Sequence, residues 1–82
     1  MTYFVLNCRD LKHRDKAIKR LKAVGRVFCT EPSDDEELQI WMMYDGELSF
    51  DKINPDEVGL AVFTKIKAFI IAIDARKPLT KE

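Results

Sequence analysis

The sequence predicts an α+β fold in which two helices cover one face of an antiparallel sheet. Three apolar runs have the length of strands, at 2–8, 38–44 and 68–74, and residues 11–24 show the period of an amphipathic helix. A strong helix start follows at Asn54-Pro55. A chain of 82 residues makes one small domain. The predicted order is strand, helix, strand, strand, helix, strand.

The first strand, residues 2–8, is apolar on both alternating faces, as a central strand would be. Asp10 offers an N-cap and Gly25 a C-terminal stop for the helix between them. Arg14 projects into the apolar arc of this helix, and we expect its aliphatic stem to pass the sheet edge. The predicted core face consists of Leu11, Ala17, Ile18, Leu21 and Val24.

The middle of the chain predicts two more strands around a polar loop. Residues 26–30 form a short strand, residues 31–37 the loop, and the apolar run 38–44 the third strand. Asp45-Gly46 then allows either a hairpin turn into an extra strand at 47–50 or a loop before the next helix.

The last third predicts a second helix and a final strand. Asn54-Pro55 combines an N-cap with proline at the first helical position, so we expect a helix over 55–65. The run 68–74 predicts a largely buried strand. The domain then spans 1–75 and ends in a polar tail, 76–82.

With both helices on one face of an antiparallel sheet, this order is the ferredoxin-like βαββαβ arrangement. The other face, which we term the open sheet face, should then carry apolar side chains that need a cover. Its expected members are Tyr3, Val5, Phe28, Trp41 and Met43. A homodimer, a protein partner or a nucleic-acid platform could supply that cover. The lack of Lys and Arg in 38–44 counts against the platform.

The formal net charge of zero conceals a strong segregation of charge along the chain. Residues 1–30 carry eight Lys or Arg against two Asp or Glu, residues 31–57 one against ten, and residues 58–82 five against two. Such a dipolar surface could steer a charged partner. With no apolar run of membrane-spanning length and no signal peptide, we expect a cytoplasmic protein without membrane contact.

Two charged clusters are candidate binding sites. The acidic loop, defined as Glu31, Asp34, Asp35, Glu36 and Glu37, lacks the spacing of a calcium loop, so we expect either a solvated loop or a patch for a basic partner. The basic stripe, defined as Lys12, Lys16, Lys19 and Arg20, is either a solvated helix face or a nucleic-acid site.

Candidates for chemistry are few. His13, the single histidine, lies between two basic residues on a helix face that we expect to be solvated. Cys8 and Cys29 each lie in an apolar run, which predicts buried, reduced thiols. We therefore expect no catalytic residues, no metal and no cofactor.

The layout resembles the small CRISPR adaptation endoribonucleases and their ferredoxin-like toxin–antitoxin relatives. The resemblance lies in Leu21-Lys-Ala-Val-Gly25 at the end of a basic helix, in Ile40-Trp41-Met42-Met43, and in Phe69-Ile-Ile-Ala-Ile73. It implies a dimer and a metal-binding Asp at the end of the first strand. Asn7-Cys8 stands there instead, and Asp10 follows two residues later, so a non-catalytic relative is implied.

The functional prediction is a small, non-enzymatic interaction module, a homodimer that binds a macromolecular partner through the open sheet face or the acidic segment 31–57. A regulator or inhibitor carried by a phage or mobile element fits this size and charge distribution. The alternative is an RNA- or DNA-binding protein, or a divergent ribonuclease with residual activity around Asp10, that uses the basic helix 11–24.

Overall fold

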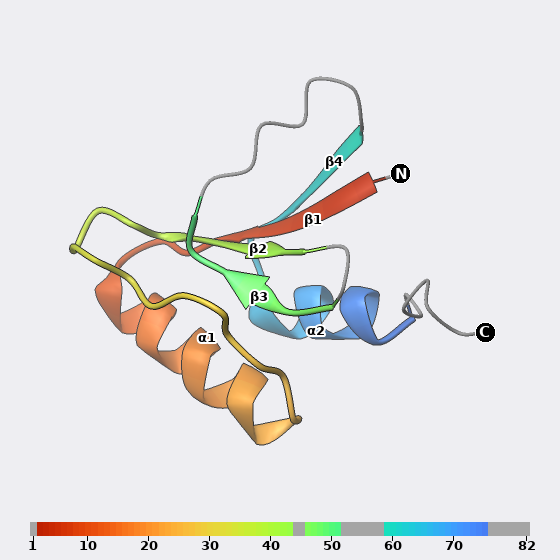
Figure 1. The fold of residues 1–82 in the computed structure, drawn as a ribbon, viewed down its shortest axis with the longest axis horizontal. Helices are drawn as coiled ribbons and strands as arrows, with labels where there is room; N and C mark the ends of the chain where they lie inside the picture. The colour runs from red at the N-terminus through yellow and green to blue at the C-terminus, as the bar shows by residue number, and fades with distance from the viewer. Residues whose placement is uncertain (1, 44–45, 52–58, 76–82) are drawn as a thin grey trace.

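The computed structural model describes residues 2–43, 46–51 and 59–75, and it confirms the α+β class (Figure 1). Within these residues, two helices accompany a four-stranded sheet in the order β-α-β-β-β-α, which is roughly ferredoxin-like. The elements are β1 (Thr2–Asn7), α1 (Leu11–Ala23), β2 (Gln39–Met42), β3 (Leu48–Ser49), β4 (Gly59–Phe63) and α2 (Ile66–Ala75).

The sheet is mixed, whereas we expected it to be wholly antiparallel. Its strand order is β3-β2-β1-β4, with β1 antiparallel to β2, β2 antiparallel to β3, and β4 parallel to β1. Leu6 pairs with Ile40 on one side and with Phe63 on the other. Because paired residues point to the same face, these three side chains share one face of the sheet.

Both helices pack on that face (Figure 1). The core joins Leu6 and Ile40 of the sheet to Leu21 of α1 and to Phe69 and Ile73 of α2, all with 0% exposure. The predicted division of β1 and β2 into a helix-facing side and an opposite side is therefore correct.

The first two elements lie where the sequence predicts them. Asp10 Oδ1 accepts a hydrogen bond of 2.8 Å from His13 N, which makes Asp10 the N-cap of α1. Gly25 follows the helix with a φ of +89°, a conformation that glycine adopts without strain. Within the predicted core face, Ala17 and Leu21 are buried, but Leu11 and Val24 at the helix ends are exposed.

The predicted strand 26–30 is only partly formed. Phe28 makes one parallel bridge to Leu48, supported by hydrogen bonds of 2.8 Å from Leu48 N to Val27 O and from Cys29 N to Leu48 O. The Phe28 ring stacks on the Phe50 ring, with 5.7 Å between the two ring centroids, and it packs against the core. Phe28 thus belongs to the helix-covered side, and its assignment to the open sheet face is wrong.

The extra strand that Asp45-Gly46 allowed does form, as β3, and the third predicted strand is β2, shorter at both ends than 38–44. Met43 N donates to Glu47 O at 2.8 Å, which closes the hairpin. Asp45 itself lies outside the described residues.

The two C-terminal elements are the reverse of the prediction. Residues 59–63, expected in a helix, form β4, and residues 68–74, expected as a strand, lie in α2. Alternation explains β4, since Leu60 and Val62 are exposed while Ala61 and Phe63 are partly buried. The start of that predicted helix, 55–58, and the tail 76–82 lie outside the described residues.

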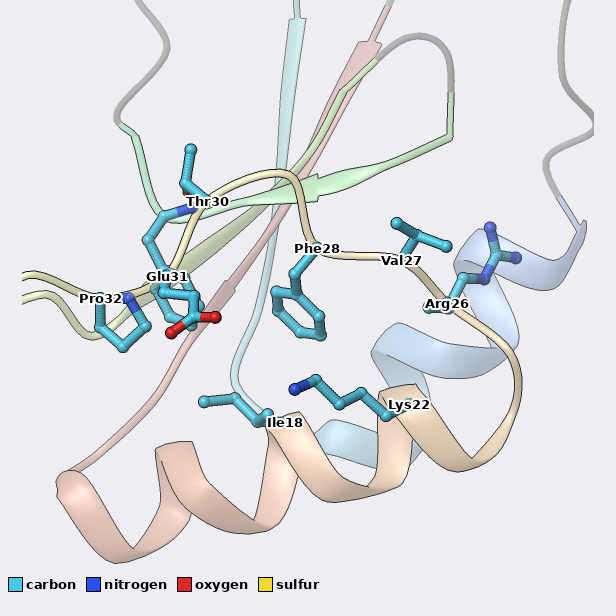
Figure 2. Close-up of a pocket in the computed structure, with 9 residues that line it drawn as sticks. Ile18, Lys22, Arg26, Val27, Phe28, Thr30, Glu31 and Pro32 are labelled. Carbon is cyan, nitrogen blue, oxygen red and sulfur yellow. Dashed lines mark hydrogen bonds between the residues drawn. The ribbon is translucent and has the colours of Figure 1, made fainter.

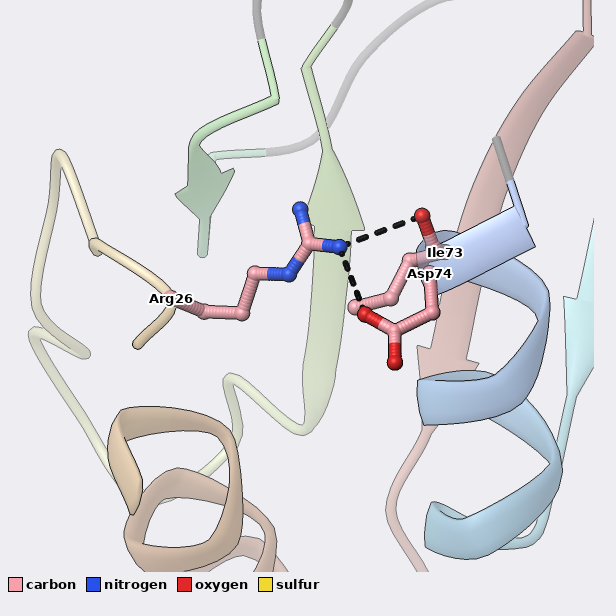
Figure 3. Close-up of polar contacts among 3 residues, drawn as sticks. All are labelled: Arg26, Ile73 and Asp74. Atoms are coloured by element: carbon pink, nitrogen blue, oxygen red, sulfur yellow. Dashed lines mark hydrogen bonds and ion pairs between the residues drawn. The ribbon is translucent and has the colours of Figure 1, made fainter. Parts of the chain in front are cut away.

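Arg26 joins the segment after α1 to the end of α2 (Figure 3). Its Nη2 donates to Ile73 O and to Asp74 Oδ1, both at 3.1 Å. The last turn of α2 carries no basic residue of its own. Arg26 therefore supplies the cation that a helix C-terminus favours, from another part of the chain.

Candidate anion-binding site

The open sheet face is covered at its centre. Val5 and Trp41 lie on it as expected, yet they are only 1% and 2% exposed, and Tyr3 and Met43 are half-buried. The expectation of an exposed apolar surface at these positions is therefore wrong.

The acidic loop is organised by Arg14 rather than left free. Arg14 is 8% exposed, and its Nη1 donates to Asp34 O at 3.0 Å and Glu37 O at 2.9 Å. We expected the Arg14 side chain to pass the sheet edge, but it binds the backbone of the acidic loop instead. The carboxylates of Glu37 and Asp34 accept backbone hydrogen bonds from Ser33 and Glu36.

Glu31, Asp35 and Glu36 remain exposed on that loop. Across residues 2–43, 46–51 and 59–75, no three His, Cys, Asp or Glu side chains come together in a way that could hold a metal ion.

The two cysteines differ in environment. Cys8 is buried in the core, as expected, and burial raises the pKa of its thiol to about 11 against the opposing effect of Arg14 and Arg9. Cys29 is exposed, which corrects the expectation of two buried thiols.

A cavity of about 510 Å³ lies between α1 and the segment 26–32 (Figure 2). Phe28 points from that segment toward Ile18 and Lys22 of α1, and Lys22 Nζ lies 5.9 Å from the Phe28 ring centroid. The lining of this cavity includes cations, one carboxylate (Glu31) and apolar groups. This mixture does not select a ligand of one charge.

A second pocket, of about 280 Å³, has a far more uniform lining, and we term it the basic pocket. It is lined by Arg9, His13, Lys16, Arg20, Lys65, Ile66 and Lys67. Five of these seven residues are Lys or Arg, and none of the described lining residues is Asp or Glu. A concave surface that concentrates one sign of charge attracts anions.

Three segments build the basic pocket: the loop after β1, which carries Arg9, then α1, and the start of α2. Asp10 starts α1, and the spacing of His13, Lys16 and Arg20 places them along one side of that helix. Ile66, 5% exposed and part of the core, anchors the start of α2, so that its neighbours Lys65 and Lys67 flank the pocket.

His13 is the buried polar residue of the pocket, at 7% exposure, and not the solvated side chain that we expected. Its Nδ1 accepts a hydrogen bond of 3.0 Å from Arg9 N. An accepting Nδ1 carries no proton, so the neutral ring carries its proton on Nε2. Burial, followed by the charge of Arg9, lowers the pKa of His13 and favours this neutral form.

The predicted basic stripe is divided between the pocket and the surface. Lys16 and Arg20 line the basic pocket, while Lys12 and Lys19 are exposed outside its lining. Sequence reasoning missed Arg9, His13, Lys65 and Lys67. The i, i+3, i+7 spacing of His13, Lys16 and Arg20 was a usable signal, whereas Lys65 and Lys67 join them only through the tertiary fold.

Comparison of the chain with protein-family models, with curated proteins and with solved structures found no match. The resemblance to CRISPR adaptation endoribonucleases stays a prediction. In the part of the chain that the structure describes, no helix is both long and apolar enough to cross a membrane.

Proposed function

We propose that this protein is a non-enzymatic nucleic-acid-binding module that holds the phosphate backbone at its basic pocket. The observation that carries the proposal is the lining of that pocket, in which Lys and Arg from three segments converge and no described residue contributes a carboxylate. Clusters of this kind bind nucleic acid by neutralising phosphates and releasing counterions. Asp10, the candidate for residual nuclease activity, uses its carboxylate as the N-cap of α1.

The position of Lys65 and Lys67 supports an anionic ligand. They lie at the start of α2, where the helix dipole places positive charge, and the first turn holds no acidic residue. Cations at this end of a helix are unfavourable for the folded chain alone. A bound phosphate would offset that unfavourable charge.

The covered sheet face determines the kind of recognition. Trp41 is 2% exposed and so offers no free ring on which a base could stack. We therefore expect binding that depends on phosphates and salt, with little preference for base sequence.

A charge-reversal pair tests the proposal. Lys16→Glu with Lys65→Glu changes two pocket residues, and Lys12→Glu with Lys19→Glu makes the same change in net charge outside the pocket lining. In fluorescence anisotropy with a random single-stranded RNA, we expect the pocket pair to weaken binding more than about tenfold and the control pair to have a much smaller effect. Equal losses for the two pairs would contradict a site at the pocket.

The exposed carboxylates of the acidic loop favour a second candidate function, in which the loop binds a basic protein partner. Arg14 holds the backbone of this loop, so Asp35 and Glu36 are presented from a fixed support. Asp35→Lys with Glu36→Lys should abolish this interaction in a pull-down and leave RNA binding intact. Loss of RNA binding instead would remove this candidate.

Homodimerisation also stays a prediction, and strand β4 is its best-supported contact. This strand lies at one edge of the sheet, and Leu60 and Val62 on it are 42% and 53% exposed. Exposed strand edges are templates for pairing with another chain. Light scattering of the wild type and of Val62→Lys would show a dimer and its loss, whereas a monomeric wild type would contradict the prediction.

A further inference from the structure

We propose that the basic pocket is a discrete site for a single phosphate group, and that the Nε2–H of His13 is its innermost hydrogen-bond donor. This inference deepens the proposed function, because it states how one phosphate is held rather than that a polyanion is attracted. It rests on the environment of His13 and on the composition of the pocket.

The hydrogen bond from Arg9 N fixes the ring. Because Nδ1 accepts that bond at 3.0 Å, Nε2 is the polar atom of the ring left to contact a ligand. Within the described residues, Nε2 has no hydrogen-bond partner, and it is not one of the buried side-chain atoms left without one, which are Arg14 Nε and Trp41 Nε1. It therefore stays accessible, although His13 as a whole is only 7% exposed. A donor that stays accessible on a largely buried side chain is free to hydrogen-bond an acceptor that enters the pocket.

The charges around His13 specify the chemistry of that acceptor. Lys16 and Arg20 approach from α1, Lys65 and Lys67 from the start of α2, and Arg9 from the loop after β1. An acceptor surrounded by these cations should be an anion, and guanidinium groups are suited to two oxygens of one phosphate. A volume of about 280 Å³ leaves room for such a group.

The single histidine makes the site directly observable. With one imidazole in the chain, its Hε1 and ring nitrogen NMR signals report on the pocket alone. Titration of the full chain with inorganic phosphate, at constant ionic strength set by chloride, should shift these signals saturably while the ring keeps its proton on Nε2. A chloride titration should leave them unchanged.

Two variants test the donor and the charge. His13→Asn keeps an acceptor close to the position of Nδ1 but removes the Nε2 donor, and we expect it to weaken phosphate binding by about tenfold or more, followed on backbone amide signals. Lys19→Gln removes a charge from the same helix outside the pocket lining, and it should bind phosphate as the wild type does. Unshifted His13 signals, or equal affinity in His13→Asn, would overturn the proposal.

The result for RNA separates this inference from the proposed function. If phosphate shifts His13 but RNA does not bind, the phosphate site stands and the nucleic-acid function falls. If RNA binds without any change at His13, the function stands and the phosphate site falls. Oligonucleotides with and without a 5′-phosphate then distinguish a terminal phosphate from one within the backbone.

Discussion

His13 lies in the first turn of α1, where it is buried and its Nδ1 accepts a hydrogen bond from the backbone N of Arg9, and this environment disfavours a charged ring. Arg9 and Lys16 add to the effect of burial, while Asp10 opposes it. Arg20 on α1 and Lys65 and Lys67 at the start of α2 also line the pocket, and they carry positive charge as Arg9 does.

The lowered pKa of His13 predicts a loss of stability in acid. In the folded chain the pKa lies below the ordinary 6.5, so near that pH the unfolded chain binds more protons than the folded one. The contribution of His13 to the free energy of unfolding is thus fully present above pH 6.5 and declines as the pH falls below it. Urea unfolding of wild type and His13→Asn at pH of about 7.5 and about 5 measures it.

The difference in unfolding free energy between these two proteins should shrink at the lower pH, because only the wild type loses the contribution of a neutral ring. Comparison with a matched variant removes the effect of carboxylates that titrate in both proteins. A difference that is the same at both pH values would contradict the buried, neutral His13.

The two thiols should react at different rates. The raised pKa of Cys8, about 11, leaves almost no thiolate near neutral pH, and the side chain is buried, whereas Cys29 is exposed. Iodoacetamide should label one thiol in the native protein, which peptide mass spectrometry should identify as Cys29. Rapid native labelling in a Cys29→Ser variant would show that Cys8 is accessible.

At the level of elements, α2 is the strongest departure from the prediction and is the easiest to test. In the helix, Ile73 is 0% exposed and Ile71 is 59% exposed, whereas the predicted strand 68–74 places both on one buried face. We expect Ile73→Ala to lower the free energy of unfolding by about 2–5 kcal/mol. Ile71→Ala should change it by no more than about 0.5 kcal/mol. Similar losses in urea unfolding would favour the strand.

The first half of the fold could be predicted because its local signals agree. Asp10 and Gly25 mark the ends of α1, and alternation assigns the faces of β1 and β2 correctly. The second half could not, because residues 68–74 are apolar at almost every position and so match a buried helix and a buried strand equally well. Gly59 lies inside the predicted helix 55–65, where glycine is unfavourable, and this was a local signal against that helix.

At the scale of the whole molecule, the fold selects which of the segregated charges act together. The basic segments 1–30 and 58–82 are far apart in the sequence, yet Arg9, Lys16 and Lys65 line one pocket. Half of the basic stripe could be assigned to this site from the sequence. Lys65 and Lys67 could not be assigned to it, because they reach the pocket only where the start of α2 lies beside α1, which no local pattern encodes.

The salt dependence of RNA binding tests the central claim most directly. Affinity for a random single-stranded RNA, measured by fluorescence anisotropy across a series of chloride concentrations, should fall linearly on a double-logarithmic plot. Removing two phosphate contacts with Lys16→Gln and Lys65→Gln should reduce the slope by roughly 1.4, while Lys12→Gln and Lys19→Gln should leave it nearly unchanged. A wild type that does not bind at low salt, or a slope that the pocket pair leaves unchanged, would contradict phosphate binding at the basic pocket.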